Sequence, residues 1–435
     1  MTDDPQHPDL PPEAEPEHDA SGAPPVPAGG RDPEGRAGRG RRGVVGGFLA
    51  VLAVVIVSLN LRPGATSLGP LMADVVTSYG QGGTASGFLT ALPCLAFGVL
   101  GAVAVPVSRR IGLTGTVVAS FVLVTLGLLL RPTADTFLAF TLLSVLALVG
   151  PALGNVVVPA WIKRHGGRRS VLLVTTYTTV LAVGGAAGSM LAVPLAPGGG
   201  EGWRDSLQFW GLISVGVVAV WAIVLTRTGH DFPPEGPQGT LRTSLLRSPT
   251  AIALTVMFAL QSTNAYTQFG LLPQILTDSG VTPARAGLIV GSISGWGIVG
   301  GLLMPTIIDR SRRLPWIVGG LGLLTASGYA GLLLAPGLSP LLWTSVLGIG
   351  GVSFPSVLAL IPARSRDPLI TARLSGMVQP VGYLLAALGP ISAGAVLEAR
   401  GTSAMLILMG SSGLLLAVAG YRAARPRMVD DELSA

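Results

Sequence analysis

The apolar residues of this chain fall into long segments separated by short polar connections. A helix needs about 20 mostly apolar residues to cross a bilayer, and each segment provides roughly that length. Twelve such segments lie at 44–72, 86–106, 113–131, 136–161, 170–195, 206–226, 249–276, 284–306, 315–335, 339–362, 371–396 and 401–422. The pattern predicts an all-α, polytopic membrane protein with twelve transmembrane helices. A transmembrane barrel is disfavoured, because its strands would alternate polar with apolar residues.

The polar segments divide the chain into five parts. Residues 1–43 are rich in acids, proline and glycine, cannot bury a core, and are expected to form a disordered tail. They do not begin like a signal peptide, so we expect the first span to be retained. The long polar connection at 227–248 separates one set of six spans, 44–226, from a second, 249–422. Residues 423–435 form a second tail.

The two sets of six spans repeat one another. Residues match in pairs at an offset of 200 positions, within one, for spans two and eight, and of 203 positions for spans four and ten. The pairs are Gly87 with Gly287, Pro106 with Pro305, Arg110 with Arg310, and Pro159 with Pro362. The repeat predicts two pseudo-symmetric six-helix bundles joined by a linker, which is how one class of secondary transporters is built.

The charges indicate an orientation. Only 11% of residues are charged, against roughly 25% in soluble domains. If the N-terminus is cytoplasmic, 23 basic residues fall on the cytoplasmic side and four on the other, namely Arg131, Arg204, Arg285 and Arg400. Basic residues stay in the cytoplasm, so we expect a cell-membrane protein with both termini cytoplasmic. No basic run is interleaved with aromatics, and nucleic acid is not an expected partner.

Two segments are distinctive, and they read SLNLRPGATSLGPLMADV in span one and SGFLTALPCLAFGVLGAVAVPVSRRIGL from span two. They resemble the major facilitator superfamily, in the branch of cyanate and nitroimidazole transporters. The turns after spans two and eight occupy the superfamily's signature loop, with Arg109 and Arg110 in one copy and Asp309 and Arg310 in the other. The first copy lacks the usual acid and the second lacks the glycine, which disfavours the common drug-efflux branches.

The resemblance implies a fold and a mechanism. It implies the major facilitator fold and a carrier that alternates access by rocking one half against the other. The substrate would bind between the halves near the membrane midplane. The two signature turns would then act as conformational gating loops. The resemblance does not identify the substrate.

Arg62 is a charged residue inside the first apolar segment. A charge at the centre of a span costs roughly 2.5–3.5 kcal/mol on insertion scales, which suggests that it has a use. Pro63 and Gly64 follow directly and would loosen the helix. In one interpretation, Arg62 faces the central cavity and its planar guanidinium binds an anionic or nitro-bearing solute. In the alternative, span one ends at Leu61 and Arg62 extends to the outer surface.

Other polar residues within spans are candidates for the same site. Gln261, Asn264 and Gln268 share one helix face in span seven, which corresponds to span one, and could line a cavity or a helix contact. Tyr266 lies off this face and is expected to pack. The remaining candidates, each of which could instead be structural, are Asn60, Asn155, Tyr177, Gln379 and Tyr383.

The sequence lacks several groups that proton relays, disulfides and nucleotide-driven pumps use. No Asp, Glu or His falls inside a predicted span, so proton coupling would involve Asp74 at the rim or a protonated substrate, and uniport or another coupling ion is equally open. Cys94 is the only cysteine and is expected to pack in the core. No nucleotide-binding GxxxxGK[ST] motif occurs. No cofactor, metal or enzymatic activity is predicted.

These observations predict a monomeric secondary transporter of a small polar or anionic solute, embedded in the lipid bilayer. Cyanate and nitroimidazoles are examples of such solutes. One alternative is a multidrug or metabolite efflux carrier of the same superfamily. An alternative from another class is a membrane sensor or scaffold that acts through the acidic N-terminal tail.

Overall fold

The computed structural model describes residues 46–198, 200–232, 244–335 and 339–434, and these ranges are helical almost throughout, with no strand. The predicted tail at 1–43 and the middle of the predicted linker lie outside them. The first half comprises α1 (Gly47–Asn60), α2 (Pro63–Thr66), η1 (Gly69–Leu71), α3 (Met72–Ser78), α4 (Gly83–Ile111), α5 (Leu113–Leu130), η2 (Arg131–Thr133), α6 (Phe137–Ala147), α7 (Val149–His165), η3 (Gly167–Arg169), α8 (Ser170–Leu191), η4 (Gly200–Gly202) and α9 (Trp203–Thr228). The second comprises η5 (Leu245–Arg247), α10 (Pro249–Asp278), α11 (Pro283–Arg310), α12 (Leu314–Leu334), α13 (Pro340–Gly350), α14 (Ser353–Ala363), α15 (Pro368–Ala386), α16 (Leu388–Ala423) and α17 (Val429–Ser434).

Ten helical segments in the described ranges are long and apolar enough to cross a membrane. One of them, Leu369–Ala423, is 55 residues long and breaks at Gly401, whose φ of 78° is not helical, so it supplies two spans. The 30-residue α10 is also long enough, although the amides of Gln261, Asn264 and Gln268 make it less apolar. Together these segments account for the twelve predicted spans.

Several spans are broken, and the breaks follow the predicted repeat. Span one breaks at Arg62, where Pro63 starts a new helix because proline has no N–H to continue the old one. Span four is interrupted at Leu148 and span ten at Gly351, and these residues are 203 positions apart. The same irregularity at equivalent places supports the two-half organisation.

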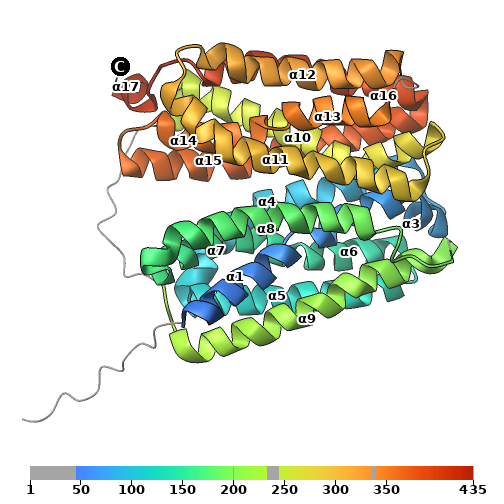
Figure 1. The fold of residues 1–435 in the computed structure, drawn as a ribbon, viewed down its shortest axis with the longest axis horizontal. Coiled ribbons are helices and arrows are strands. Elements are labelled where there is room, and N and C mark those ends of the chain that lie inside the picture. The colour runs from blue at the N-terminus through green and yellow to red at the C-terminus, as the bar shows by residue number, and fades with distance from the viewer. Residues whose placement is uncertain (1–45, 199, 233–243, 336–338, 435) are drawn as a thin grey trace, which may run out of the picture. The chain divides into compact units, whose positions relative to one another are not determined.

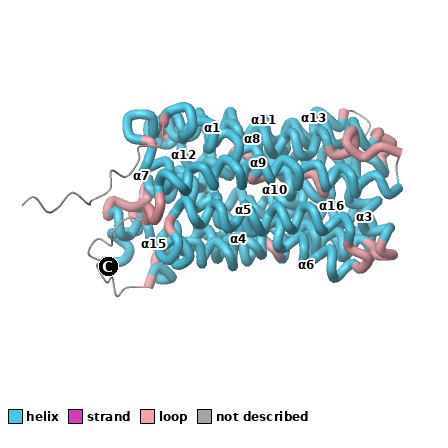
Figure 2. Tube along the Cα trace, turned by 90° about the horizontal axis from the view of Figure 1, so that it is seen from below, coloured by secondary structure: helices cyan, strands magenta, loops and turns pink. Residues whose placement is uncertain are grey.

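The helices form two bundles, with α1–α9 in one and α10–α17 in the other (Figure 1). Each bundle has its own apolar core. Trp161 and Trp221 lie in the core of the first, and Trp221 Nε1 donates a 3.0 Å hydrogen bond to the carbonyl of Ala53 on α1. Phe258 and Met257 of α10 lie in the core of the second. The long helices run side by side and their connections gather at two ends (Figure 2).

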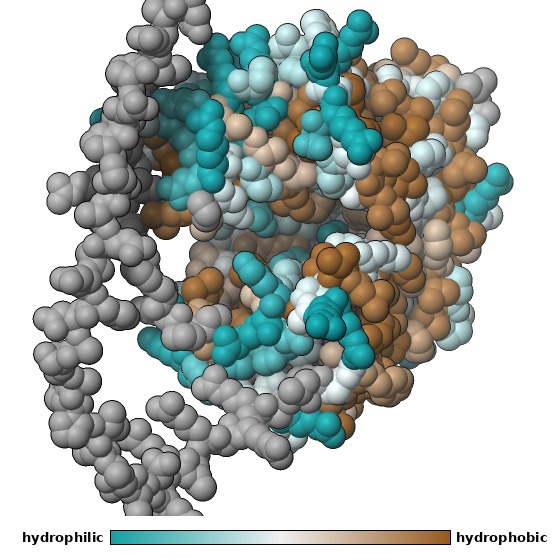
Figure 3. All heavy atoms as spheres, turned by 60° about the vertical axis from the view of Figure 1, so that its left-hand side comes forward, coloured by the Kyte–Doolittle hydropathy of each residue, from teal (hydrophilic) through white to brown (hydrophobic). Residues whose placement is uncertain are grey.

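The two ends differ in charge. At one end lie the last turns of α4, α7 and α11 and the residue that ends α14, which contribute Arg109, Lys163, Arg310 and Arg364. We call it the arginine-rich end. A hollow separates the bundles on this face, with hydrophilic residues around it (Figure 3). The other end, which carries the connections after α3, α5 and α10, is called the opposite end.

The bundles pack together toward the opposite end, through glycines of α4 and α16. A Cβ at Gly87 would lie 2.4 Å from the carbonyl oxygen of Pro390 and 2.9 Å from Gly394 Cα, so the two backbones approach too closely for a larger side chain. Glu398, near the break in α16, accepts a 2.7 Å hydrogen bond from the backbone N–H of Thr84. On the other side of the molecule, Ser189 of α8 donates to the carbonyl of Gly287 on α11 at 3.3 Å. These contacts close the opposite end.

A carboxylate anchors the arginine-rich end of the first bundle. Asp231, just after α9, accepts hydrogen bonds from the backbone N–H of Thr114 at 3.0 Å and from its hydroxyl at 2.7 Å, and lies 2.9 Å from Nε2 of His165. Burial disfavours the charged carboxylate, but the hydrogen bonds from His165 and Thr114 outweigh burial and lower the pKa of Asp231. The ionised carboxylate therefore stabilises the start of α5.

Replacing Asp231 by Asn should lower the thermal unfolding temperature, because a hydrogen-bonded charge contributes about 1.5–3 kcal/mol. The folded pKa lies below the unfolded value of about 4, so the difference from wild type should be complete above that value. It should disappear as pH falls through the folded pKa. A thiol-reactive dye that reports the exposure of buried Cys94 on heating measures the transition. Asp278→Asn, at an exposed residue, is the control, and equal transitions for wild type and Asp231→Asn at pH 6 would contradict the assignment.

Candidate functional site

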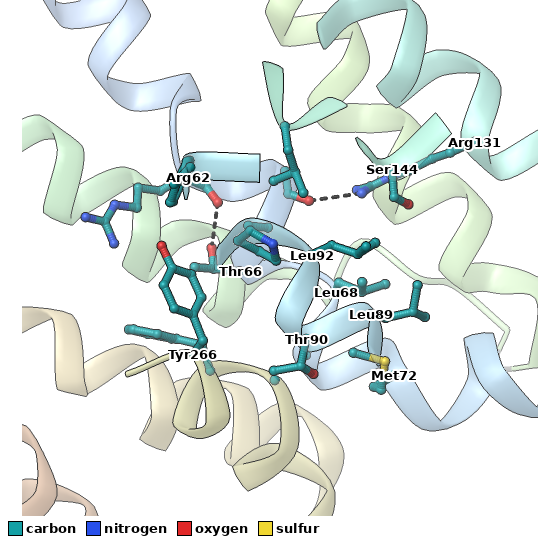
Figure 4. A pocket seen from close by; sticks show the side chains of 18 of the residues that line it. Arg62, Thr66, Leu68, Met72, Leu89, Thr90, Leu92, Arg131, Ser144 and Tyr266 are labelled. Carbon is teal, nitrogen blue, oxygen red and sulfur yellow. Dashed lines mark hydrogen bonds between the residues drawn. The ribbon is translucent and has the colours of Figure 1, made fainter. Parts of the chain in front are cut away.

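A small cavity lies where span one breaks, between the two bundles (Figure 4). Its volume is about 40 Å³. Residues of the α1–α2 break, α4, the α5–η2 junction, α6 and α10 surround it. The two charged residues in its wall are Arg62 and Arg131, and no carboxylate lines it among the described residues. The cavity therefore has a positive potential that favours an anion.

Arg62 lies at the break itself, between α1 and α2, and is half-buried. Its backbone carbonyl accepts a 3.3 Å hydrogen bond from the Thr66 hydroxyl. A Cβ on Gly185 of α8 would lie 3.6 Å from Arg62 Cβ and 3.6 Å from Ser294 Oγ of α11, so the arginine stem lies where the two bundles meet. Within the described part of the chain, its guanidinium has neither a hydrogen-bond acceptor nor a carboxylate partner.

Three tyrosines lie near the Arg62 guanidinium. Its charge interacts with Tyr177 of α8, Tyr266 of α10 and Tyr383 of α15, so both bundles contribute. The rings of Tyr266 and Tyr383 lie 6.4 Å apart, and Phe97 lies 5.2 Å from Tyr383. These groups form an aromatic wall beside the charge.

The structure brings some of the predicted polar residues to this wall. The hydroxyl of Tyr177 donates a 3.2 Å hydrogen bond to Oδ1 of Asn155 on α7, which joins two candidates that the sequence left isolated. Tyr383 lies in the wall, whereas Gln379, one turn earlier, donates a 2.8 Å hydrogen bond to Ser375 within α15. Asn60 is 2% exposed, and neither of its amide atoms has a partner among the described residues.

The amide face of α10 does not lie beside Arg62. Asn264 is fully buried against Ser412 of α16, with Nδ2 3.1 Å from the serine hydroxyl. Gln268 donates a 3.2 Å hydrogen bond to the hydroxyl of Tyr329 on α12, and Gln261 lies 3.5 Å from the carbonyl of Gly351. All three contacts are inside the second bundle. The sequence allowed this face either to line a cavity or to form a helix contact, and in the structure it forms a helix contact.

The α10 side chain that lies at the cavity is Tyr266, not one of the three amides. It lies off their face and was expected to pack, yet it lines the cavity near Arg62 (Figure 4). Helical spacing indicates which residues share a face, but it does not indicate which face meets the other bundle. The gating residues Arg109, Arg110, Asp309 and Arg310 are exposed at the arginine-rich end, and their role stays a prediction.

Arg131 is a site residue that sequence reasoning missed. The charge pattern placed it among the few basic residues of the opposite side, but it is 2% exposed and lines the cavity. Its Nη1 donates a 3.0 Å hydrogen bond to the carbonyl of Gly64 in α2. A sequence signal was present, because Arg62 and Arg131 each stand between a leucine and a proline at a helix break.

The chain is similar in sequence to known proteins. The family model described as Major Facilitator Superfamily matches residues 46–364. The 2-nitroimidazole transporter of Escherichia coli (strain K12) is 30% identical over 385 residues, covering 88% of this chain and 97% of that protein. The cyanate transport protein CynX of the same strain is 26% identical, covering 82% and 91%.

The fold also matches a solved transporter. The chain superimposes on an inward-facing, occupied bacterial homologue of the human lysosomal transporter Spinster with a TM-score of 0.70 and 16% identity, over 88% of this chain and 97% of that one. The family match, the relatives and the fold agree with the twelve-span, two-bundle architecture. This chain therefore belongs to the Major Facilitator Superfamily and is a secondary transporter of small solutes, not an enzyme.

Proposed function

We propose that this transporter carries a small anionic or nitro-bearing solute and that Arg62 binds it. The observation that carries the proposal is the half-buried guanidinium at the break in span one, which has no acceptor in the described chain and lies near three tyrosines. A guanidinium offers several N–H donors in one plane, which suits paired oxygens or nitrogens. Relatives named for 2-nitroimidazole and cyanate support this solute class.

The cavity's charges also favour an anion over a cation. Its wall contains two arginines and, in the described ranges, no acid. A cationic drug would be repelled at this depth, where screening by water is weak. Asp74, the acid considered for proton coupling, is exposed on α3 and does not line the cavity. Proton-coupled transport is therefore explained more simply by a proton that the substrate itself carries across the membrane.

Uptake into proteoliposomes tests the solute class. Labelled cyanate, nitrate, benzoate and 2-nitroimidazole, with xylose and a quaternary ammonium dye as neutral and cationic comparisons, would be added to vesicles containing the purified protein. We expect saturable uptake of at least one anionic or nitro-bearing solute, reduced by an excess of the same unlabelled solute. Saturable uptake of xylose or the dye, with none of the anions or the nitro compound, would overturn the proposal.

The transporter is proposed to act as a monomer in the cytoplasmic membrane, with both termini and the arginine-rich end in the cytoplasm. The arrangement follows the 23 to 4 division of basic residues. The hollow at the arginine-rich end and the closed opposite end then correspond to an inward-facing state (Figure 3), as in the similar Spinster homologue.

Reporter fusions test the orientation. A fusion after Ser78 should be active only for an extracytoplasmic reporter, and a fusion after Arg242 only for a cytoplasmic one. The expected result follows from the short connection after α3 and the basic linker lying on opposite sides of the membrane. If both fusions report the same side, the twelve-span arrangement is wrong.

A further inference from the structure

Arg131 is a buried charge with no counterion among the described residues. It lies at the start of η2, directly after α5, and only 2% of its surface is exposed. Its Nη1 donates to the Gly64 carbonyl at 3.0 Å, while Nε and Nη2 are buried without an acceptor. The described ion pairs involve other residues. Two of the three guanidinium nitrogens therefore have no hydrogen-bond acceptor in the described chain.

A second unpaired donor lines the same cavity. The hydroxyl of Ser144 on α6 is buried without a partner, and Ser144 is 2% exposed. Figure 4 shows Ser144 beside Arg131, whereas Arg62 lies across the helix break and points away from both. Arg131 and Ser144 thus make a second polar corner in the cavity wall, separate from the aromatic wall around Arg62.

The energetics favour an anion at this corner over water. A buried ion without a partner costs several kcal/mol. Water would satisfy the hydrogen bonds but not the charge, whereas an anion satisfies both. The cavity of about 40 Å³ exceeds the roughly 10–15 Å³ that one water needs, so a monatomic or linear triatomic monoanion fits.

We propose that Arg131 and Ser144 form a binding site for a small monovalent anion, which neutralises the buried guanidinium and joins α2, η2 and α6. The site does not depend on Arg62 binding the transported solute. The ion can be an abundant inorganic anion such as chloride, or the transported solute itself if that solute is as small as cyanate. Both share the chemistry of a compact monoanion that accepts hydrogen bonds from N–H and O–H groups.

Anion-dependent thermal stability of the full-length protein tests the site. Chloride would be exchanged at constant ionic strength for gluconate, a much larger organic anion, and unfolding would be followed by the exposure of Cys94. Binding of radiolabelled chloride by the purified protein gives a second readout. We expect chloride to raise the transition temperature in a saturable way and gluconate to have no effect. Cyanate should compete for the radiolabelled chloride.

Single-residue variants test whether the chloride effect arises from binding at Arg131 and Ser144. Ser144→Ala should weaken the apparent affinity for chloride about tenfold, the effect of losing one hydrogen bond to a charged group. Ser120→Ala is the matched control, because Ser120 is equally buried but its hydroxyl bonds to the Val117 carbonyl at 2.9 Å. Arg131→Gln should abolish chloride binding. Because it also disturbs the buried hydrogen bond to the Gly64 carbonyl, which supports the fold, Ser144→Ala is the deciding variant. Arg62→Gln should retain the chloride effect.

Three results would overturn the site. Equal transitions in chloride and gluconate, without radiolabelled chloride binding, would mean that water fills the corner. Chloride binding unchanged in Ser144→Ala would place the ion elsewhere. Chloride binding lost in Arg62→Gln would assign the ion to the proposed substrate site. Loss of solute uptake in Arg62→Gln with chloride binding intact supports both proposals, whereas intact uptake with intact chloride binding rejects only the role of Arg62.

Discussion

Arg62→Lys should weaken substrate binding by roughly 1–3 kcal/mol, which is about 5- to 150-fold in the dissociation constant. Lysine keeps the positive charge but has a single ammonium in place of a planar fork, so it cannot bind two solute atoms at once. Arg62→Ala should lose more, because the charge is removed as well. Equilibrium binding of the solute identified by uptake, measured with purified protein, gives these values.

The comparison needs an arginine outside the cavity and a check on folding. Arg285 at the start of α11 is exposed and lies outside the cavity wall, so Arg285→Lys should bind solute normally. The thermal exposure of Cys94 shows whether each variant is folded. Normal solute affinity in a folded Arg62→Ala protein would refute the substrate site and leave the family assignment intact. It would also support the alternative in which Arg62 only anchors the helix end.

Gly87→Ala should reduce transport roughly tenfold or more, because it prevents the closed arrangement at the opposite end. The added Cβ would lie 2.4 Å from the Pro390 carbonyl oxygen and 2.9 Å from Gly394 Cα. Such overpacking costs about 1–3 kcal/mol, and the cost falls only on the state in which α4 and α16 touch. A carrier that cannot populate one of its two states cannot complete a cycle.

The single cysteine reports this change directly. Cys94 is fully buried on α4 and packs with Ala386 and Ala387 at the contact between the bundles. In Gly87→Ala, a membrane-impermeant maleimide added from the opposite side should label Cys94 faster than in wild type. Gly295→Ala is the control, since a Cβ at Gly295 meets nothing within 4 Å. Unchanged transport together with unchanged labelling of Cys94 would show that α4 and α16 tolerate the extra methyl.

The helical spans and the two-half repeat could be predicted because they depend on local properties. The length of an apolar segment decides whether a helix can cross a bilayer, and the chain alone contains that information. Leu148 and Gly351 interrupt spans four and ten at the offset that the sequence repeat predicts. The break at Arg62 was also visible, because Pro63 cannot continue a helix.

The membership of the site depended on tertiary structure. Periodicity correctly grouped Gln261, Asn264 and Gln268 on one face of α10, but that face packs inside the second bundle, and Tyr266 on another face meets the cavity. Arg131 has the same Leu-Arg-Pro context as Arg62, and the charge pattern places it on the side opposite the cytoplasm. Its burial is set by the packing of η2 against α6 and α9 and by its hydrogen bond to the Gly64 carbonyl of α2.

The sequence by itself determined the helix lengths, the repeat and the charge asymmetry of this protein, because each follows from residues close together in the chain. Only the tertiary structure decided which polar groups meet. Arg62 and Tyr266 are about 200 residues apart in sequence, and the rotation of each helix about its axis, set by packing with its neighbours, brings both to one cavity. The same packing places Arg131 and Ser144 in a single corner without a counterion from the described chain.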